Sequence, residues 1–151
     1  MTAVALAAAA LLLTPTLTNA AQCPAASEAQ VRSEFASWMK AYKGRDLSGT
    51  MAIFDPGVRF AFQGVADQDW TALQAGYAAE FKARAKSVWT PKWDDVLVSG
   101  DLATAFATWT ETVAGKRGRT VRGVNRAVDI LRRGADCRWR IVRSLNYPVA
   151  R

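Results

Sequence analysis

The sequence predicts one α+β domain in which three helices pack on a curved, mainly antiparallel sheet and leave a cone-shaped pocket between them. The first observation behind this prediction is the order of the elements, because three amphipathic helical stretches follow residue 27 and four long strand-like stretches follow residue 86. The second is the shortness of the turns between those strands, which favours antiparallel neighbours. The third is size: 151 residues, half of them apolar, suffice for one core and are too few for two.

The first helix should begin at Ser27, because Ser27 and Gln30 have the spacing of a capping box, and it should end near Lys43. Its apolar side chains recur at helical spacing, at Val31, Phe35, Trp38, Met39 and Tyr42. A short second helix, capped by Asp46, should follow and end at the turn residues 55–57. Apolar and polar side chains then alternate over residues 58–63, which predicts a short strand.

Asp67 or Asp69 should cap a third helix that reaches the basic residues 82–86. Four further strands are expected at residues 87–98, 102–114, 119–133 and 137–147, separated by short turns that contain glycine. The helices and the last strand should share one core, made of Phe35, Trp38, Tyr77, Phe81, Trp139 and Ile141.

The first 21 residues are typical of a secretory signal peptide. The first twenty carry no charged side chain, and an apolar run at residues 3–13 leads to small residues suited to cleavage after Ala20 or Ala21. The run is too short for a permanent membrane span, so we expect no stable transmembrane anchor. Residues 22–151 should then form the mature, single-domain protein, which we expect to be exported to the periplasm or secreted.

If the protein is exported, its cysteines should form a disulfide, because two cysteines in an oxidising compartment usually pair. Cys23 and Cys137 are the only two in the chain, so we expect a disulfide that ties the mature N-terminus to the start of the last strand. The alternative is a free, buried Cys137 with a mobile Cys23.

The chain contains no histidine, which excludes histidine-based metal sites, Ser-His triads and Cys-His pairs. We expect neither a metal nor a cofactor. The net charge of +7 gathers in the last third of the chain. A basic patch can bind nucleic acid, but for an exported protein we expect no nucleic-acid partner and read the arginines as the solvated face of paired strands.

Several short motifs occur in a recognisable order over residues 27–147. They are Phe54-Asp55-Pro56 with Val58, then Gly64, then Tyr77 with Phe81, then the segment 98–103, and finally Trp139-Arg-Ile-Val-Arg143. In this order the chain resembles the nuclear transport factor 2-like superfamily, and within it the SnoaL-like domains of bacteria.

The resemblance implies a cystatin-like cone with a cavity open at one end, and it implies a possible homodimer through the outer face of the sheet. Relatives of this kind include isomerases, cyclases and hydrolases that use an Asp, Glu or His, and proteins that only bind. Many SnoaL-like sequences carry histidines near the end of the last strand, where this chain has Arg143, Ser144 and Leu145.

Strand alternation suggests which side chains face the cavity. If Trp139 and Ile141 point inward, Arg143 should follow them and Ser144 should point outward. The candidate catalytic carboxylates are Glu111, Asp129 and Asp55, one of which would have a raised pKa if it lay near Trp109 or Trp93. The expected ligand-binding residues are Tyr42, Phe62, Trp93 and Trp109 beside Glu111, with Arg126 or Arg143 supplying positive charge.

Three functions therefore remain open. The first is an exported pocket protein that binds a small, largely apolar or weakly anionic molecule without chemistry. The second is an acid-base enzyme of the isomerase or cyclase type that uses a pocket carboxylate. The third is a module that docks onto protein or lipid. A buried carboxylate with a raised pKa inside a cavity would favour the enzyme, and a large exposed apolar patch on the sheet would favour the module.

Overall fold

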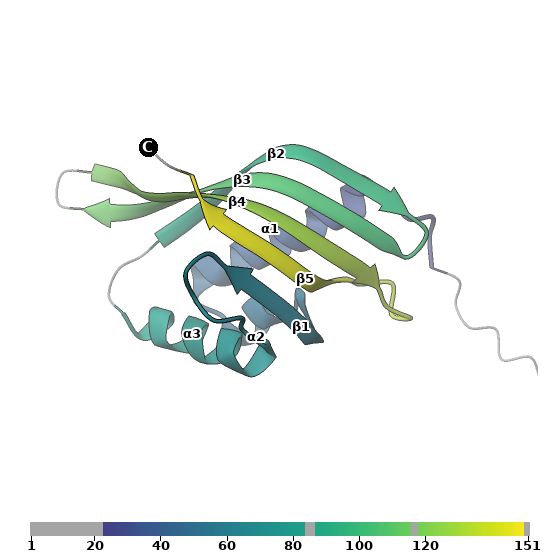
Figure 1. Ribbon diagram of the computed structural model, residues 1–151, viewed down its shortest axis with the longest axis horizontal. Helices are drawn as coiled ribbons and strands as arrows, with labels where there is room; N and C mark the ends of the chain where they lie inside the picture. The colour runs from purple at the N-terminus through teal and green to yellow at the C-terminus, as the bar shows by residue number, and fades with distance from the viewer. Residues whose placement is uncertain (1–22, 84–86, 116–117, 150–151) are drawn as a thin grey trace, which may run out of the picture.

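The computed structural model describes residues 23–83, 87–115 and 118–149, and the predicted signal peptide lies outside them. Within these ranges the chain forms three helices and one five-stranded sheet (Figure 1). The elements in chain order are α1 (Glu28–Gly44), α2 (Leu47–Met51), β1 (Phe54–Phe62), α3 (Trp70–Lys82), β2 (Ser87–Ser99), β3 (Leu102–Gly115), β4 (Gly118–Arg133) and β5 (Trp139–Pro148).

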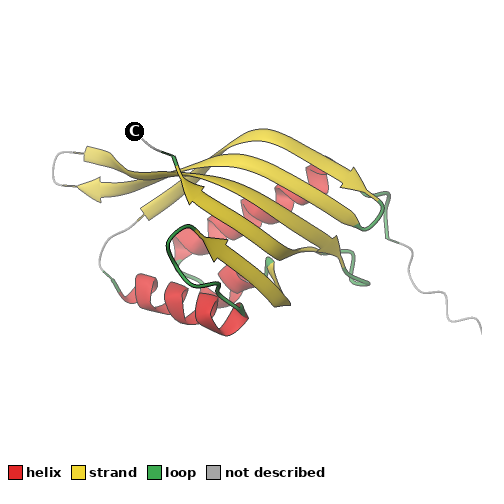
Figure 2. Cartoon of the chain, viewed as in Figure 1, coloured by secondary structure: helices red, strands yellow, loops and turns green. Residues whose placement is uncertain are grey.

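The strands lie in the order β1-β5-β4-β3-β2, with β1 parallel to β5 and every other pair antiparallel. The sheet is long and curved, and the helices lie on one side of it (Figure 2). This arrangement confirms the predicted α+β fold with helices on a curved, mainly antiparallel sheet. No helix in the described ranges is long and apolar enough to cross a bilayer.

Each described helix begins where a side chain satisfies its free N–H groups. Ser27 and Gln30 form the predicted capping box on α1. Asp46 accepts a hydrogen bond from the Gly49 N–H of α2 at 3.0 Å, and Asp69 accepts one from the Ala72 N–H of α3 at 2.9 Å. The N-terminal caps therefore follow the sequence signals.

Strand β1 starts earlier than predicted, at Phe54, and so includes Pro56. Proline removes a hydrogen-bond donor and is tolerated at the edge of a sheet. Because β1 is an edge strand and its register against β5 shifts between Phe54 and Arg59, the turn residues fit within it. The prediction that residues 55–57 separate the second helix from the strand was therefore wrong.

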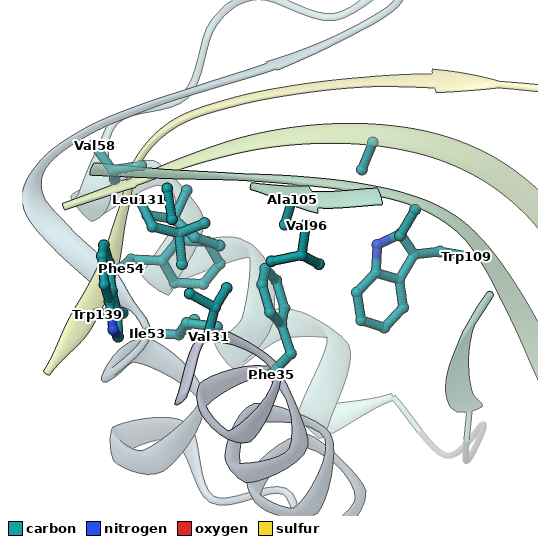
Figure 3. Close-up of a cluster of buried hydrophobic side chains, with 14 of the residues drawn as sticks. Val31, Phe35, Ile53, Phe54, Val58, Val96, Ala105, Trp109, Leu131 and Trp139 are labelled. Atoms are coloured by element: carbon teal, nitrogen blue, oxygen red, sulfur yellow. The ribbon is translucent and has the colours of Figure 1, made fainter. Parts of the chain in front are cut away.

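The core fills the space between α1, α3 and the concave face of the sheet. Figure 3 shows Phe35 and Val31 of α1 facing Val96, Ala105, Leu131 and Trp139 of the sheet. Phe35, Trp139 and Ile141 are buried as predicted, and Trp38 and Tyr77 pack against them. Phe81 is half-buried, and its ring lies edge-on to Tyr42 and tilted against Tyr77.

The predicted disulfide is present. Cys23 and Cys137 are joined with an S–S distance of 2.11 Å, across a sequence separation of 114 residues. The Arg133 guanidinium strengthens the same attachment, because its Nη2 donates to the Pro24 carbonyl at 2.6 Å and its Cζ lies 5.8 Å from the Trp139 ring. The first described residues are thus fixed to the end of the sheet where β4 turns into β5.

A β-bulge in β5 reverses the expected orientation of its second half. Leu131 of β4 pairs with Ile141, but the next residue, Ile130, pairs with Arg143, so Val142 is an extra residue. Trp139 and Ile141 face the core as predicted. Beyond the bulge Ser144 is buried, whereas Leu145 is 53% exposed. The expectation that Arg143 points inward and Ser144 outward was wrong for this reason.

Candidate functional site

A cavity of about 590 Å³ lies between the concave face of the sheet and the helices α1 and α3. This volume lies in the range of pockets for small organic molecules. Most of its wall is aromatic or aliphatic: Phe35, Trp38, Ile53, Phe54, Phe60, Phe62, Tyr77, Ala83, Trp89, Trp109 and Ile141. The polar lining residues are Glu80, Glu111, Asn125, Asp129, Ser144 and Asn146.

Asp129 is a buried carboxyl group of this cavity. Strand β4 places it opposite Ser144 of β5, on the concave face, where its residue surface is 5% exposed. Ser144 Oγ donates to Asp129 Oδ1 at 2.5 Å, and Asn146 Nδ2 donates to Ser144 Oγ at 2.7 Å. The bulge at Val142 makes this contact possible, because it turns Ser144 and Asn146 to the concave face.

Burial raises the pKa of Asp129 to about 7, although the hydrogen bond from Ser144 opposes the rise. A carboxyl group with such a pKa carries a proton about half of the time near neutral pH. It can therefore both accept and donate a proton there, which ordinary surface carboxylates do poorly.

Tyr77 of α3 lines the same cavity. Burial raises its pKa, and electrostatic interactions with the acidic groups of Glu80, Tyr42 and Asp129 raise it further. The phenol therefore keeps its proton at neutral pH and is a hydrogen-bond donor beside two carboxyl groups.

A second polar cluster joins α1, α3 and β2. The Tyr42 hydroxyl donates a short hydrogen bond to Glu80 Oε1 and lies 2.6 Å from Ser87 Oγ. Ser87 Oγ lies 3.3 Å from the same Glu80 oxygen. Burial, followed by the hydrogen bond to Glu80, raises the pKa of Tyr42 to about 12, so this phenol also stays protonated.

The structure brings several of the predicted site residues together. Phe62, Trp109, Glu111 and Asp129 all line the cavity, and Glu111 is only 8% exposed. Trp93 lies outside the lining and packs on Phe35, with ring centroids 5.1 Å apart. Tyr42 is likewise outside the lining and reaches the cavity through Glu80.

Asp55 is not at the cavity. Its Oδ1 accepts a hydrogen bond from the Gly57 N–H at 2.8 Å, and this turn lies in the edge strand β1. The expectation that Asp55 lies at a cavity wall was therefore wrong, and its carboxylate has the role of a turn residue.

Arg126 and Arg143 are also absent from the cavity wall, contrary to expectation. Arg126 lies on the outer face, where its Nη2 pairs with Asp94 Oδ2 at 3.0 Å and its guanidinium lies over the Phe106 ring. Arg143, turned outward by the bulge, donates to the Gly57 carbonyl at 3.3 Å. Among the described residues that line the cavity, none is a lysine or an arginine.

The sequence reasoning missed Glu80, Trp89, Asn125, Ser144 and Asn146 as lining residues. Glu80 had a signal, because it follows Leu73 and Tyr77 on one stripe of the third helix at spacings of four and three residues. No sequence signal pointed to Ser144 and Asn146, because the bulge that orients them cannot be recognised from the alternation of apolar and polar residues. Across the described ranges, no group of three Asp, Glu or Cys side chains is placed to hold a metal ion.

The comparison with known proteins agrees with this geometry. A family model described as SnoaL-like domain matches residues 35–142. A protein of unknown function from Mycobacterium tuberculosis shares 22% identity over 82% of this chain and 72% of that chain, with a TM-score of 0.71. An NTF2-like protein with a cystatin-like fold from Novosphingobium aromaticivorans shares 19% identity over 80% of each chain, with a TM-score of 0.67.

A third structure, a ketosteroid isomerase-like protein from Erwinia carotovora, shares 16% identity over 82% of this chain and 96% of that chain, with a TM-score of 0.65. At these identities the similar structures support the fold alone. No curated protein shows significant similarity to the sequence. The family model covers well over half of the chain, and its range contains most of α1, all of α2, α3 and β1 to β4, the first part of β5, and Asp129. The chain therefore belongs to the SnoaL-like domain family, with the nuclear transport factor 2-like, cystatin-like fold.

Proposed function

We propose that this protein binds a small, largely apolar molecule in its cavity and moves a proton on that molecule with Asp129, as an acid-base enzyme of the isomerase or cyclase type. The observation that carries the proposal is the Asp129 carboxyl itself: it is buried on an otherwise mostly apolar wall, held by Ser144, and has a pKa of about 7. Perturbed carboxyl groups inside pockets are frequent at catalytic sites.

The proposed reaction begins with a carbonyl compound bound against the aromatic wall. The Asp129 carboxylate removes a proton from the carbon next to the carbonyl, and the electron pair of the broken C–H bond forms an enolate. Tyr77 donates a hydrogen bond to the enolate oxygen, because its raised pKa keeps the phenol protonated. Where a C=C double bond is conjugated with the enolate, the Asp129 acid then returns its proton to the far carbon of the conjugated system, so the double bond moves and an isomer is formed without an oxidant or a co-reactant.

The structure favours this function over binding alone, because a pure binding pocket has no need of a half-protonated carboxyl group. One structural relative is described as ketosteroid isomerase-like; at 16% identity it supports the fold and identifies neither the reaction nor the substrate of this chain. The expectation of a weakly anionic ligand loses its basis, because Arg126 and Arg143 lie outside the cavity.

We also propose that residues 1–21 are a signal peptide and that the mature domain, residues 22–151, works in the periplasm or outside the cell. The uncharged leader supports this, and so does the Cys23–Cys137 disulfide, because such bonds persist in oxidising compartments.

A further part of the proposal concerns assembly through the outer face of the sheet. This face carries exposed apolar side chains on β2, β3, β4 and β5, namely Leu97, Leu102, Ile130 and Leu145. Exposed apolar groups that gather on one face are typical of protein contacts. We propose that two copies of the chain pair through this face.

Proton exchange with solvent tests the catalytic part directly. The probe is 2-tetralone, an apolar ketone, in D2O, and the measurement is the loss of its α-proton NMR signals with and without protein. Wild type should accelerate the exchange, and the rate should rise through pH 7 as Asp129 ionises. Asp129→Asn should remove the acceleration, whereas Asp55→Asn, a matched change outside the cavity, should preserve it. If wild type binds 2-tetralone but does not accelerate its exchange, the protein is a binding protein and the catalytic proposal is refuted. If Asp129→Asn keeps full activity, Asp129 is not the base.

A further inference from the structure

The charged side chains that line the cavity are all acidic in the part of the chain that the structure describes. They are Glu80 on α3, Glu111 on β3 and Asp129 on β4. The arginines that were expected to face a ligand instead pair with groups on the outer surface. A ligand that carries a negative charge would therefore meet no cationic group among the described lining residues, and it would meet the Glu80 carboxylate on the helical side of the cavity.

Glu80 is the most clearly oriented of these groups. Its Oε1 accepts the hydrogen bond from the Tyr42 hydroxyl and lies within 3.3 Å of Ser87 Oγ. Tyr42 keeps its proton because burial and Glu80 raise its pKa to about 12. Both hydrogen bonds use Oε1, and within the described ranges no hydrogen bond to Oε2 is seen, so this second oxygen is left for a ligand. Three separate elements, α1, α3 and β2, thus fix one carboxylate at the cavity.

The wall beside this carboxylate is aromatic. Trp38, Tyr77 and Trp89 line the cavity together with Glu80, and Trp89 is two residues from Ser87 on the same strand. Faces of indole and phenol rings attract cations, most strongly where water is excluded. A carboxylate next to such rings is the arrangement that holds an ammonium group, because the charge is compensated and the hydrocarbon part of the ligand is buried.

We propose that the ligand of this cavity is a small apolar amine, whose ammonium group binds Glu80 while its hydrocarbon part lies among the aromatic rings. This proposal rests on the proposed function in one respect: both place a ligand in the same cavity. Because Glu80 is on a helix and Asp129 is on the sheet, Asp129 remains available to a different part of the same ligand.

Three naphthalene derivatives of nearly equal size test the inference: 2-naphthylmethylamine, 2-naphthylmethanol and 2-naphthoate. Binding is followed at pH 8 and low salt by quenching of the tryptophan fluorescence, with isothermal titration calorimetry as a second measurement. The ammonium form should bind wild type at least about tenfold more tightly than the alcohol, and the carboxylate should bind most weakly. Glu80→Gln should abolish the preference for the amine and leave the affinity for the alcohol unchanged. Glu28→Gln, which makes the same change in net charge on the exposed surface of α1, should keep the preference.

The outcomes separate this inference from the proposed function. If the alcohol binds and the amine shows no advantage, or if Glu80→Gln retains the advantage, the amine assignment is overturned while Asp129 chemistry stands. If none of the three probes binds to folded protein, the cavity does not take ligands of this size and both proposals fail. Loss of alcohol binding in Glu80→Gln would show that Glu80 supports the structure rather than the ligand, which also overturns the assignment.

Discussion

Asp129→Asn should make the protein more stable at pH 8 and change its stability little at pH 4. The reason is that folding buries the Asp129 carboxyl and raises its pKa from 3.8 to about 7. The charged form is therefore destabilised in the folded state. Asparagine has nearly the same shape, can still accept a hydrogen bond from Ser144, and never carries the charge.

The sign follows from proton linkage. Below pH 3.8 the group is protonated in both folded and unfolded chains, and it costs no stability. Between about pH 4 and 7 the folded chain holds more protons than the unfolded chain, so the free energy of unfolding falls as the pH rises. Above pH 7 the full cost is present. The difference between 3.8 and about 7 corresponds to about 4 kcal/mol at about 1.4 kcal/mol per pKa unit, an upper estimate for a buried group.

The assay is urea unfolding of both proteins, with the disulfide intact, at half-unit steps from pH 4 to pH 8. The difference in unfolding free energy between Asp129→Asn and wild type should grow steadily over this range and level off above pH 7. Parallel curves for the two proteins would refute the reasoning, because they would mean that Asp129 titrates alike in the folded and unfolded chains.

Three further predictions concern the core, the disulfide and the outer face. Trp139→Ala removes a fully buried side chain and should lower the free energy of unfolding by about 3 to 5 kcal/mol; a loss under about 1 kcal/mol in reversible denaturation would show that Trp139 is not core. The double variant Cys23→Ser/Cys137→Ser opens a loop of 114 residues and should cost up to about 4 to 5 kcal/mol, and two freely alkylated thiols in unreduced wild type would contradict the bond itself. Leu145→Arg should turn a dimer into monomers in sedimentation velocity while the far-UV spectrum is unchanged, and a monomeric wild type would remove the proposed contact.

The sequence was most informative where one residue type decides a local structure. Ser27 with Gln30 located the start of α1, because the capping box satisfies the free N–H groups whatever the surroundings. The glycine-containing turns around Gly100 and Gly134 placed the long strands as antiparallel neighbours. The inward positions of Trp109 and Glu111 also followed from the sequence, since period-two alternation holds along β3 as far as Glu111.

The site was less predictable, because it depends on bulges that alternation does not reveal. Ile141 and Val142 are both apolar, so nothing in the sequence shows which of them is the extra residue. One residue was enough to move Arg143 from the expected cavity wall to the outer face, and to bring Ser144 beside Asp129. Arg126 was misplaced for a different reason: β4 pairs without a register shift from Asn125 to Ile130, so Arg126 and Asp129, which are three residues apart, face opposite sides of the sheet.

The state of the Asp129 carboxyl is the central claim, and its pKa can be measured by NMR. Protein labelled with ¹³C at the aspartate Cγ is titrated from pH 3 to pH 9, and Asp129→Asn identifies the resonance that disappears. The resonance assigned to Asp129 should titrate with a midpoint near pH 7, well above those of the exposed aspartates. A midpoint near 4 would contradict the account, because the carboxyl would then be an ordinary ionised group with no special capacity for proton transfer.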